Sequence, residues 1–365
     1  MTVLFIHGCA APGADGVGDY SRRLAAALQR HGCTAVLAAT HDRVSEPVRE
    51  QQTAGGGEVT AVRLPAAWPD AARLGALREL LAEFDPDWVS LQYVPYSFHP
   101  KGLAFGFTGR LARLLAPRRT HVMFHECWVG ISRVSPLRHR LTGRLQAGLA
   151  RRMVRRMRPD WVTTSNPLYR RVLADGGIAA DLLPLFSNIP VATPNQVGSW
   201  PLADRRAEAL VVGVFGSIYP EVDLAGELER LGERAAATGR GLLLVAFGRS
   251  GADGAARLDA LAERFGPGLE ILRLGELSAV QVSAVLQRLD VAISCTPRQH
   301  LGKSGVFAAL RLHGVEVIAN VDTPLPEYGD LIAAATEELF ARPADHWSVD
   351  WVTERKLNVL RAPAS

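Results

Sequence analysis

One loop near the end of the chain has the residue types of a phosphate-binding turn. Lys303, Ser304 and Gly305 follow a predicted buried strand at residues 289–294 and precede a predicted helix. The first turn of a helix presents unpaired backbone N–H groups and the positive end of its dipole, lysine adds a charge, and serine adds a hydroxyl. The loop lacks the glycine spacing of a Walker P-loop, so an ordinary strand–loop–helix unit remains the alternative.

Two other predicted strands in this half of the chain end in residues suited to phosphate. Gly216 and Ser217 follow the strand at residues 210–215, and Arg249 follows the strand at residues 242–247. A guanidinium group can hold two phosphate oxygens at once. Ligands of open parallel sheets bind at the carboxyl ends of the strands, so we expect a basic, amide-lined pocket here. A solvent-exposed loop arginine is the alternative.

The first predicted strand, residues 3–7, leads into a glycine-rich loop that contains Gly16, Val17 and Gly18. The glycine order does not fit the dinucleotide-binding fingerprint, and no acidic residue follows the second strand closely enough to hold a ribose. A nicotinamide-dependent enzyme is therefore disfavoured. Backbone amides at the start of the next helix still suit a phosphate group or a sugar ring.

Two further strand ends carry side chains that suit carbohydrate chemistry. His125, followed by Glu126, ends the predicted strand at residues 121–125, where an imidazole can donate a hydrogen bond to a developing charge or orient a substrate hydroxyl. A structural histidine is the alternative. The segment after residues 88–92 offers an amide and aromatic rings on which sugars stack, and rings that only cover the sheet end are equally compatible with it. Its candidate residues are Gln92, Tyr93 and Tyr96.

The elements that position these residues alternate as strands and helices over a chain of 365 residues. Strands that are apolar on both faces are typical of parallel sheets covered by helices on either side. We therefore expect an α/β protein with two Rossmann-like, doubly wound domains. The first spans residues 1–195, the second spans 207–345 after a linker at 189–206, and a C-terminal helix in 346–365 completes the first domain.

Composition limits the partners and the compartment. No apolar run reaches membrane-spanning length, a strand begins directly at the N-terminus, and the four cysteines form no CxxC pair, so we expect a cytoplasmic protein without a metal site. The net charge is +4, and much of it lies in the helix predicted at residues 137–158. Its arginines alternate with Leu and Met, which fits either peripheral contact with the inner membrane face or an ordinary helix with a solvated basic face. Without interleaved aromatic residues, a nucleic-acid partner is not expected.

Taken together, these segments resemble glycosyltransferase family four, whose members have the GT-B fold of two Rossmann-like domains facing each other across a cleft. The resemblance rests on residues 16–21, His125, residues 215–217 and the pattern of residues 308–319. It implies retaining transfer of a sugar from a nucleotide-sugar donor to a small-molecule or glycan acceptor, with no cofactor. It also implies that the second domain holds the donor, that the first offers the acceptor, and that His125 is catalytic.

The resemblance gives each candidate residue an expected role. Donor-binding residues would be Gly16, Val17, Gly18, Gly216, Ser217, Arg249, Lys303, Ser304 and Gly305. Acceptor-binding residues would be Asp19, Tyr20, Gln92, Tyr93, Tyr96 and Glu126.

The sequence departs from the family at two places. Leu301 and Ala309 stand where members commonly carry two glutamates, the second of which usually holds the nucleotide ribose. Ser217 and Glu221 stand near the place of a usual arginine and lysine. Two alternatives therefore stay open: an epimerase or coupling enzyme of the same fold that acts on sugar nucleotides, and a non-catalytic subunit that binds them.

Overall fold

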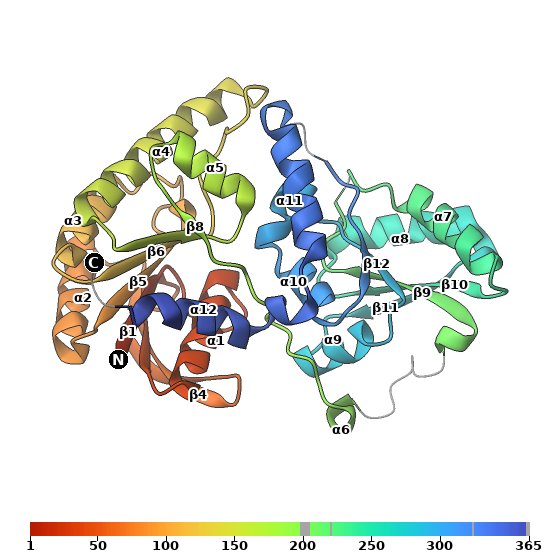
Figure 1. Cartoon of the computed structure of the whole chain (residues 1–365), viewed down its shortest axis with the longest axis horizontal. Coiled ribbons are helices and arrows are strands. Elements are labelled where there is room, and N and C mark those ends of the chain that lie inside the picture. Colours follow the sequence, from red (N-terminus) through yellow and green to blue (C-terminus); the bar gives the residue numbers. More distant parts are fainter. Residues whose placement is uncertain (198–204, 220, 323–324, 363–365) are drawn as a thin grey trace. The chain divides into compact units, whose positions relative to one another are not determined.

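The computed structural model describes residues 1–197, 205–219, 221–322 and 325–362, and the chain divides into two compact α/β units. The first unit holds Met1–Pro184, Pro324–Ala335 and Val349–Ser365, and the second holds Leu185–Thr323 and Thr336–Ser348. Helix α11 (Gly329–Ala341) contributes its first part to the first unit and its last part to the second. Figure 1 shows the elements of both units.

The first unit is built on an eight-stranded sheet with the order β3-β4-β2-β1-β5-β6-β7-β8. Only β3 runs antiparallel, next to β4. Strands β5 and β6 are buried along their whole length, and β1 is buried from Val3 onward, because helices cover both faces. The strands are β1 (Thr2–His7), β2 (Thr34–Asp42), β3 (Val48–Ala54), β4 (Gly57–Pro65), β5 (Trp88–Tyr93), β6 (Thr120–Phe124), β7 (Trp161–Thr164) and β8 (Asp181–Leu182).

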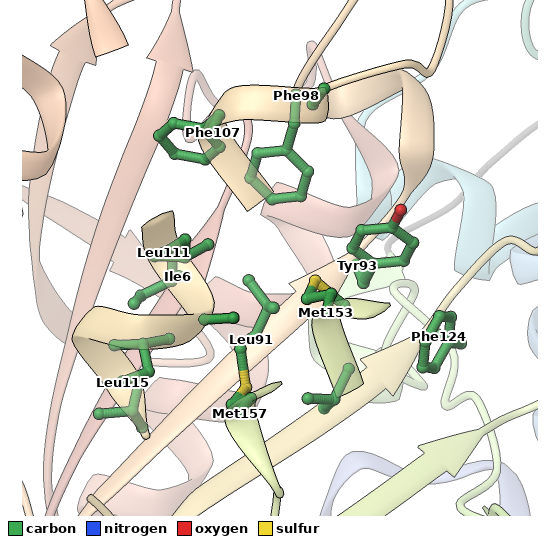
Figure 2. Packing of buried hydrophobic residues seen from close by; sticks show 14 of the residues in the cluster. Ile6, Leu91, Tyr93, Phe98, Phe107, Leu111, Leu115, Phe124, Met153 and Met157 are labelled. Atoms are coloured by element: carbon green, nitrogen blue, oxygen red, sulfur yellow. The ribbon is translucent and has the colours of Figure 1, made fainter. Parts of the chain in front are cut away.

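Helices of the first unit pack on both faces of this sheet. On one face, α2 and α3 enclose an apolar cluster that includes Leu91, Phe107 and Phe124 (Figure 2). The C-terminal helix α12 packs against α1, and Trp88 Nε1 on β5 donates a hydrogen bond to the Leu360 carbonyl at 3.0 Å. The helices are α1 (Gly16–Arg30), α2 (Asp70–Phe84), α3 (Phe105–Leu115), α4 (Leu137–Met157), α5 (Pro167–Asp175) and α12 (Val349–Leu360).

The second unit is built on a five-stranded, all-parallel sheet with the order β11-β10-β9-β12-β13. Two apolar clusters cover its faces, one of which contains Phe307 and Trp347. The strands are β9 (Ala209–Phe215), β10 (Gly241–Phe247), β11 (Glu270–Gly275), β12 (Val291–Ile293) and β13 (Glu316–Ile318). The helices are α6 (Pro194–Val197), α7 (Leu224–Ala236), α8 (Gly251–Phe265), α9 (Ala279–Leu286) and α10 (Gly305–Leu312).

Three elements differ from the sequence-based expectation. Strand β3 was not expected, because its residues are mostly polar and lie at the sheet edge. The apolar pattern of residues 182–186 predicts a strand over that range, but β8 ends at Leu182, because Pro184 has no backbone N–H to continue the ladder. The expected linker is interrupted by α6, and residues 198–204 within it lie outside the described residues.

Candidate active site

The glycine-rich loop leads directly into the first turn of α1. Asp15 caps this helix by accepting a hydrogen bond from the Val17 N–H at 3.2 Å, and burial raises the pKa of its carboxyl. Asp19 accepts a hydrogen bond from the Gly13 N–H at 3.0 Å and pairs with Arg22. The carboxylate of Asp19 is therefore engaged in shaping the loop, in addition to any contact it makes with a ligand.

A buried aspartate on the neighbouring strand anchors the same loop. Asp42, at the end of β2, accepts hydrogen bonds from the Ala10 N–H at 2.8 Å and from the Arg63 Nε at 2.9 Å. Burial alone acts to raise the pKa of Asp42, but the hydrogen bonds from Arg63 and from the backbone N–H groups outweigh it, so the pKa is lowered. The loop is thus tied to the sheet by an ionised side chain.

The glycines of the loop differ in whether a side chain could replace them. A β-carbon on Gly18 would lie 2.4 Å from the Cys9 carbonyl oxygen, whereas one on Gly16 would meet no atom within 4 Å. Gly18 is therefore required where the first turn of α1 packs on the loop. Gly16 is exposed, and its surroundings leave space for a ligand.

His125 follows β6 and lies between two of the expected site residues. Its Nε2 is 2.8 Å from the Gln92 Oε1, and its ring meets the Tyr20 ring edge-on with centroids 5.0 Å apart. All three side chains are buried. The imidazole is therefore held in one orientation at the carboxyl end of the central strands, which is the geometry required of a group that must meet a substrate atom.

The other expected acceptor residues of the first unit are placed differently from one another. Tyr93 belongs to the apolar cluster and packs against Phe98 and Phe124 (Figure 2), and burial raises its pKa. The structure therefore gives Tyr93 a packing role. Tyr96 is exposed and its hydroxyl accepts a hydrogen bond from the Gln146 Nε2 at 3.3 Å, while Glu126 is half-buried beside His125.

In the second unit, the ends of β9 and β10 approach the start of α10. A β-carbon on Gly248 would lie 3.2 Å from the Gly216 nitrogen, and one on Gly216 would lie 4.0 Å from the Val306 side chain. Both glycines have φ of +84°, a conformation that other residues rarely adopt. Gly216 therefore lies near Val306, which directly follows Lys303, Ser304 and Gly305 in the first turn of α10.

The hydroxyl of Ser304 stabilises this turn through hydrogen bonds. Its Oγ caps α10 by accepting a hydrogen bond from the Phe307 N–H at 3.2 Å, and it lies 3.0 Å from the Thr296 Oγ1. Gly305 is exposed at the first position of the helix. Half-buried Lys303 adds positive charge: burial, followed by that charge, lowers the pKa of His300 to about 4. The turn combines backbone donors with a cation, which suits an anion.

Arg249 follows β10 and is already engaged in an ion pair. Its side chain is 75% exposed and pairs with Glu276 at 2.9 Å, and a phosphate would have to compete with that carboxylate. Ser217 is exposed, and its Oγ lies 3.5 Å from the Arg249 carbonyl. The positions of the two missing glutamates, Leu301 and Ala309, are fully buried in an apolar cluster, so neither supplies a polar group to a ligand.

Several residues of this region were not identified from the sequence. Thr296 contacts the expected site residue Ser304, Asp42 holds the glycine-rich loop through the Ala10 N–H, and Gly248 lies against Gly216. Each follows or ends a strand, which is the available sequence signal. Among the described residues, no group of three or more His, Cys, Asp or Glu side chains is placed to hold a metal ion.

Helix α4 carries the basic segment expected from the sequence. Met153 and Met157 on its buried side belong to the apolar cluster of the first unit. On its exposed side, Leu137, Leu141 and Leu145 form one stripe, and Arg138 and Arg144 are exposed beside it. Throughout the described ranges, every helix is too short or too polar to cross a lipid bilayer.

Residues 15–188 match the model of the family described as "Glycosyl transferase 4-like domain". The comparison with curated proteins finds no match.

Solved structures of low sequence identity share the architecture over nearly the whole chain. Anabaena HepE in complex with UDP-glucose has a TM-score of 0.57 at 14% identity, covering 99% of both chains. Sucrose-phosphate synthase from Thermosynechococcus elongatus has a TM-score of 0.51 at 17% identity, covering 99% of this chain and 94% of the other. A putative UDP-N-acetylglucosamine 2-epimerase from Listeria monocytogenes has a TM-score of 0.52 at 13% identity, covering 99% and 95%. The expected fold class, GT-B with two Rossmann-like domains, is confirmed.

The contrast between Gly18 and Gly16 gives a testable prediction. Gly18→Ala should destabilise the first unit by about 1–3 kcal/mol, because its methyl group would overlap the Cys9 carbonyl. Gly16→Ala is the matched control and should change the free energy of unfolding by less than about 0.5 kcal/mol. Urea unfolding of the two variants makes the measurement, and equal stabilities would contradict the packing role of Gly18.

Proposed function

We propose that this GT-B protein, whose residues 15–188 carry a glycosyl transferase 4-like domain, transfers a sugar from a nucleotide-sugar donor to a small-molecule or glycan acceptor, with retention and without a cofactor. The observation that carries the proposal is the placement of His125. A buried imidazole stands at the carboxyl end of β6 and is held by Gln92 at 2.8 Å. A group fixed in this way can orient a sugar hydroxyl or donate to charge that develops during transfer.

The second unit supplies the features that a donor diphosphate needs. The start of α10 offers backbone N–H donors, Gly216 and Gly248 keep side chains away from that turn, and Lys303 contributes a positive charge. A leaving diphosphate gains negative charge as the glycosidic bond breaks, so donors and cations already in place stabilise the transition state more than the ground state. Ser217 and Arg249 are assigned here to the edge of the donor site.

The acceptor is assigned to the first unit. Asp19, Tyr96 and Glu126 are the proposed acceptor-binding residues with exposed or half-buried side chains, and Tyr20 and Gln92 act by holding His125. Gly16, Val17 and Gly18 offer the backbone of the first turn of α1 to the donor phosphates. The cytoplasm, where nucleotide sugars are made, is the proposed compartment.

Two other functions are distinguished by one experiment. A neighbour described as a putative epimerase has the same fold, and the buried Leu301 and Ala309 would suit a binding subunit without catalysis. The protein is incubated with a donor in the absence of acceptor. Slow release of nucleoside diphosphate supports a transferase, conversion of the intact sugar nucleotide supports an epimerase, and binding without turnover supports a subunit.

The donor class is found by thermal shift with UDP, GDP, ADP and dTDP. Because HepE is in complex with UDP-glucose and the Listeria protein is described as a putative UDP-N-acetylglucosamine 2-epimerase, UDP is the first candidate. A nucleotide at one hundred times its dissociation constant adds about 2.7 kcal/mol to the free energy of unfolding. Absence of a shift with all four nucleotides would contradict nucleotide-sugar binding.

We further propose that the first half of α4 contacts an anionic membrane surface. Leu137 is 67% exposed, Leu141 50% and Leu145 52%, and these side chains form a stripe at i, i+4 and i+8. Exposed Arg138 and Arg144 add charge of the sign that anionic headgroups attract. A peripheral contact of this kind would bring the first unit to lipid-linked acceptors.

The first prediction of this proposal concerns His125. His125→Ala should lower kcat by about 10²–10⁴-fold and leave the donor dissociation constant nearly unchanged, because the imidazole acts on the transferred sugar and not on the nucleotide. His139→Ala, which removes an exposed histidine on α4, serves as the control. Kinetics with saturating donor give the result, and wild-type kcat in the His125 variant would remove its proposed role.

The second prediction concerns the charge at the start of α10. Lys303→Ala should weaken binding of the nucleoside diphosphate by about 1–3 kcal/mol, the range of charge-assisted hydrogen bonds. Arg264→Ala, in the last turn of α8 of the same unit, is the matched loss of one positive charge and should leave affinity unchanged. Isothermal titration calorimetry compares the two, and equal affinities would reduce the Lys303 loop to a structural element.

The third prediction tests the membrane contact. A Leu141→Ser, Leu145→Ser double variant should lose most sedimentation with vesicles that contain phosphatidylglycerol, and binding of the wild type should weaken as salt rises. The control is Val280→Ser, which alters an apolar side chain on α9 of the second unit that is 38% exposed. Unchanged sedimentation of the double variant would contradict this contact.

A further inference from the structure

Four arginines line one groove between helices α2 and α3 of the first unit. Arg78 lies on α2, Arg110 and Arg113 lie on α3, and Arg118 follows α3. The groove has a volume of about 720 Å³, and none of the described residues that line it is an aspartate or a glutamate. It is therefore a concave surface whose charges are all positive.

Most of this charge is not balanced by neighbouring carboxylates. Arg110 pairs with Asp70 at 2.7 Å, and the same carboxylate also accepts a hydrogen bond from Arg73. In the part of the chain that the structure describes, Arg78, Arg113 and Arg118 form no ion pair. Guanidinium groups that face one groove repel each other, and a bound anion would relieve this repulsion.

The groove also has an apolar part. Leu74 lies one helical turn before Arg78 on α2, and Leu114 lies one turn after Arg110 on α3, so both leucines face the groove together with these arginines. Leu74 is buried and Leu114 is half-buried, whereas Arg78 and Arg110 are exposed. An inorganic ion would contact only the arginines, but an anion attached to an apolar body would contact both kinds of side chain.

The groove belongs to the same layer of helices as the exposed leucine stripe of α4. Side chains of α2, α3 and α4 enter one apolar cluster on one face of the sheet, and Figure 2 shows those of α3 and α4. Arg156 follows Leu145 by about three helical turns, so both point to the same side of α4. A β-carbon on Gly109 of α3 would lie 3.0 Å from the Arg156 Nη1. Arginine side chains therefore extend from α4 over α3 to the groove.

We propose that this groove binds the headgroup of an anionic membrane lipid whose phosphate is a monoester. The inference deepens the proposed membrane contact and rests on that part of the proposed function, because the leucines of α4 would bring this layer of helices to the lipid surface. A lipid fits the groove better than a free phosphate does. Its phosphate can meet the arginines while its glycerol and first acyl carbons cover Leu74 and Leu114.

The number of unpaired arginines favours a phosphomonoester over a phosphodiester. Each guanidinium fork can hold two phosphate oxygens at once. A monoester presents three terminal oxygens and nearly two negative charges, whereas a diester presents fewer oxygens and a single charge. Arg78, Arg113 and Arg118 are therefore satisfied more completely by a monoester. We expect the protein to distinguish the two kinds of lipid even when the surface charge of the membrane is the same.

The test compares phosphatidate with phosphatidylglycerol in vesicles of matched surface charge. Lipid titrations by sedimentation give the dissociation constants of the full chain. The wild type should bind the phosphatidate vesicles about tenfold more tightly, which is the effect of one charge-assisted hydrogen bond. In the double variant Arg78→Gln, Arg113→Gln this preference should disappear. Its binding to phosphatidate should be about 30-fold weaker, because each arginine near an anionic surface contributes a factor of about five.

A matched loss of two charges outside the groove is the control. Arg43 follows β2 and Arg355 lies on α12, and both are exposed arginines of the first unit. The double variant Arg43→Gln, Arg355→Gln should keep the preference for phosphatidate. The proposal is overturned by a preference that persists in the groove variant, by one that the control loses equally, or by a wild type that does not distinguish the two lipids.

The melting temperature shows whether the groove variant is folded. Because Arg78 and Arg113 are exposed and form no ion pair in the described structure, their replacement should not lower Tm at low salt. Arg118→Gln is a second variant that alters neither helix, and it should also reduce the preference for phosphatidate. It keeps the test valid if the double variant is unstable, and an unchanged preference in this variant would overturn the proposal.

A free phosphate is distinguished from a lipid by a thermal shift experiment. Tripolyphosphate is added to protein that is saturated with UDP, so that the proposed donor site is already occupied. Tripolyphosphate should stabilise the wild type less effectively than phosphatidate vesicles retain it. If tripolyphosphate raises Tm of the wild type but not of the groove variant, and neither protein distinguishes the vesicles, the groove takes a free phosphate and the lipid assignment is overturned.

The leucine variant separates this inference from the proposed membrane contact. Leu141→Ser, Leu145→Ser should lose sedimentation with both kinds of vesicle, because the apolar contact serves both. If it binds as the wild type does while the groove variant loses the preference, the groove is as proposed and the α4 contact is wrong. If the leucine variant loses binding but the groove variant keeps the preference, the α4 contact stands and this inference fails.

Discussion

The direction of parallel strands constrains both units of this protein. Because neighbouring parallel strands all end at the same edge of a sheet, the residues that follow them are brought together although they are distant in sequence. In the first unit, this edge collects the glycine-rich loop, Gln92 and His125. In the second, it collects Gly216, Gly248 and the turn that starts α10. The candidate site residues follow from this constraint more than from any single motif.

Holding these groups in place lowers the stability of the fold, because polar and charged side chains must be buried. Asp42 is buried and ionised so that it can tie the glycine-rich loop to β2. Ser90, His121 and Lys356 place polar atoms on a sheet face where apolar side chains would pack with less desolvation. Functional sites are often less stable than an apolar core would be, because they need polar groups in fixed positions. The buried polar residues Ser90, His121 and Lys356 fit this pattern.

Much of the fold could be predicted from the sequence, because buried parallel strands are short apolar runs between turn residues. Strand β3 could not be predicted in this way, since an edge strand with one exposed face carries polar residues; the signal available was the Gly55-Gly56 turn, in which both residues have positive φ. Tyr93 was expected to bind an acceptor and instead packs in the core. Its alternation with Gln92 along β5 already placed the two side chains on opposite faces. The contact between His121 and Lys356 joins residues 235 positions apart, and local patterns contain no signal for it.

The central proposal is that His125 acts on the transferred sugar of a nucleotide-sugar donor, and photochemical cross-linking tests it most directly. The reagent is a nucleotide sugar with a photoreactive diazirine on the sugar, built on the nucleotide that stabilises the protein most. After irradiation and proteolysis, mass spectrometry should find the label on the peptide that contains His125, and excess unlabelled donor should suppress it. Labelling confined to peptides of the second unit, or labelling that unlabelled donor does not suppress, would contradict the account.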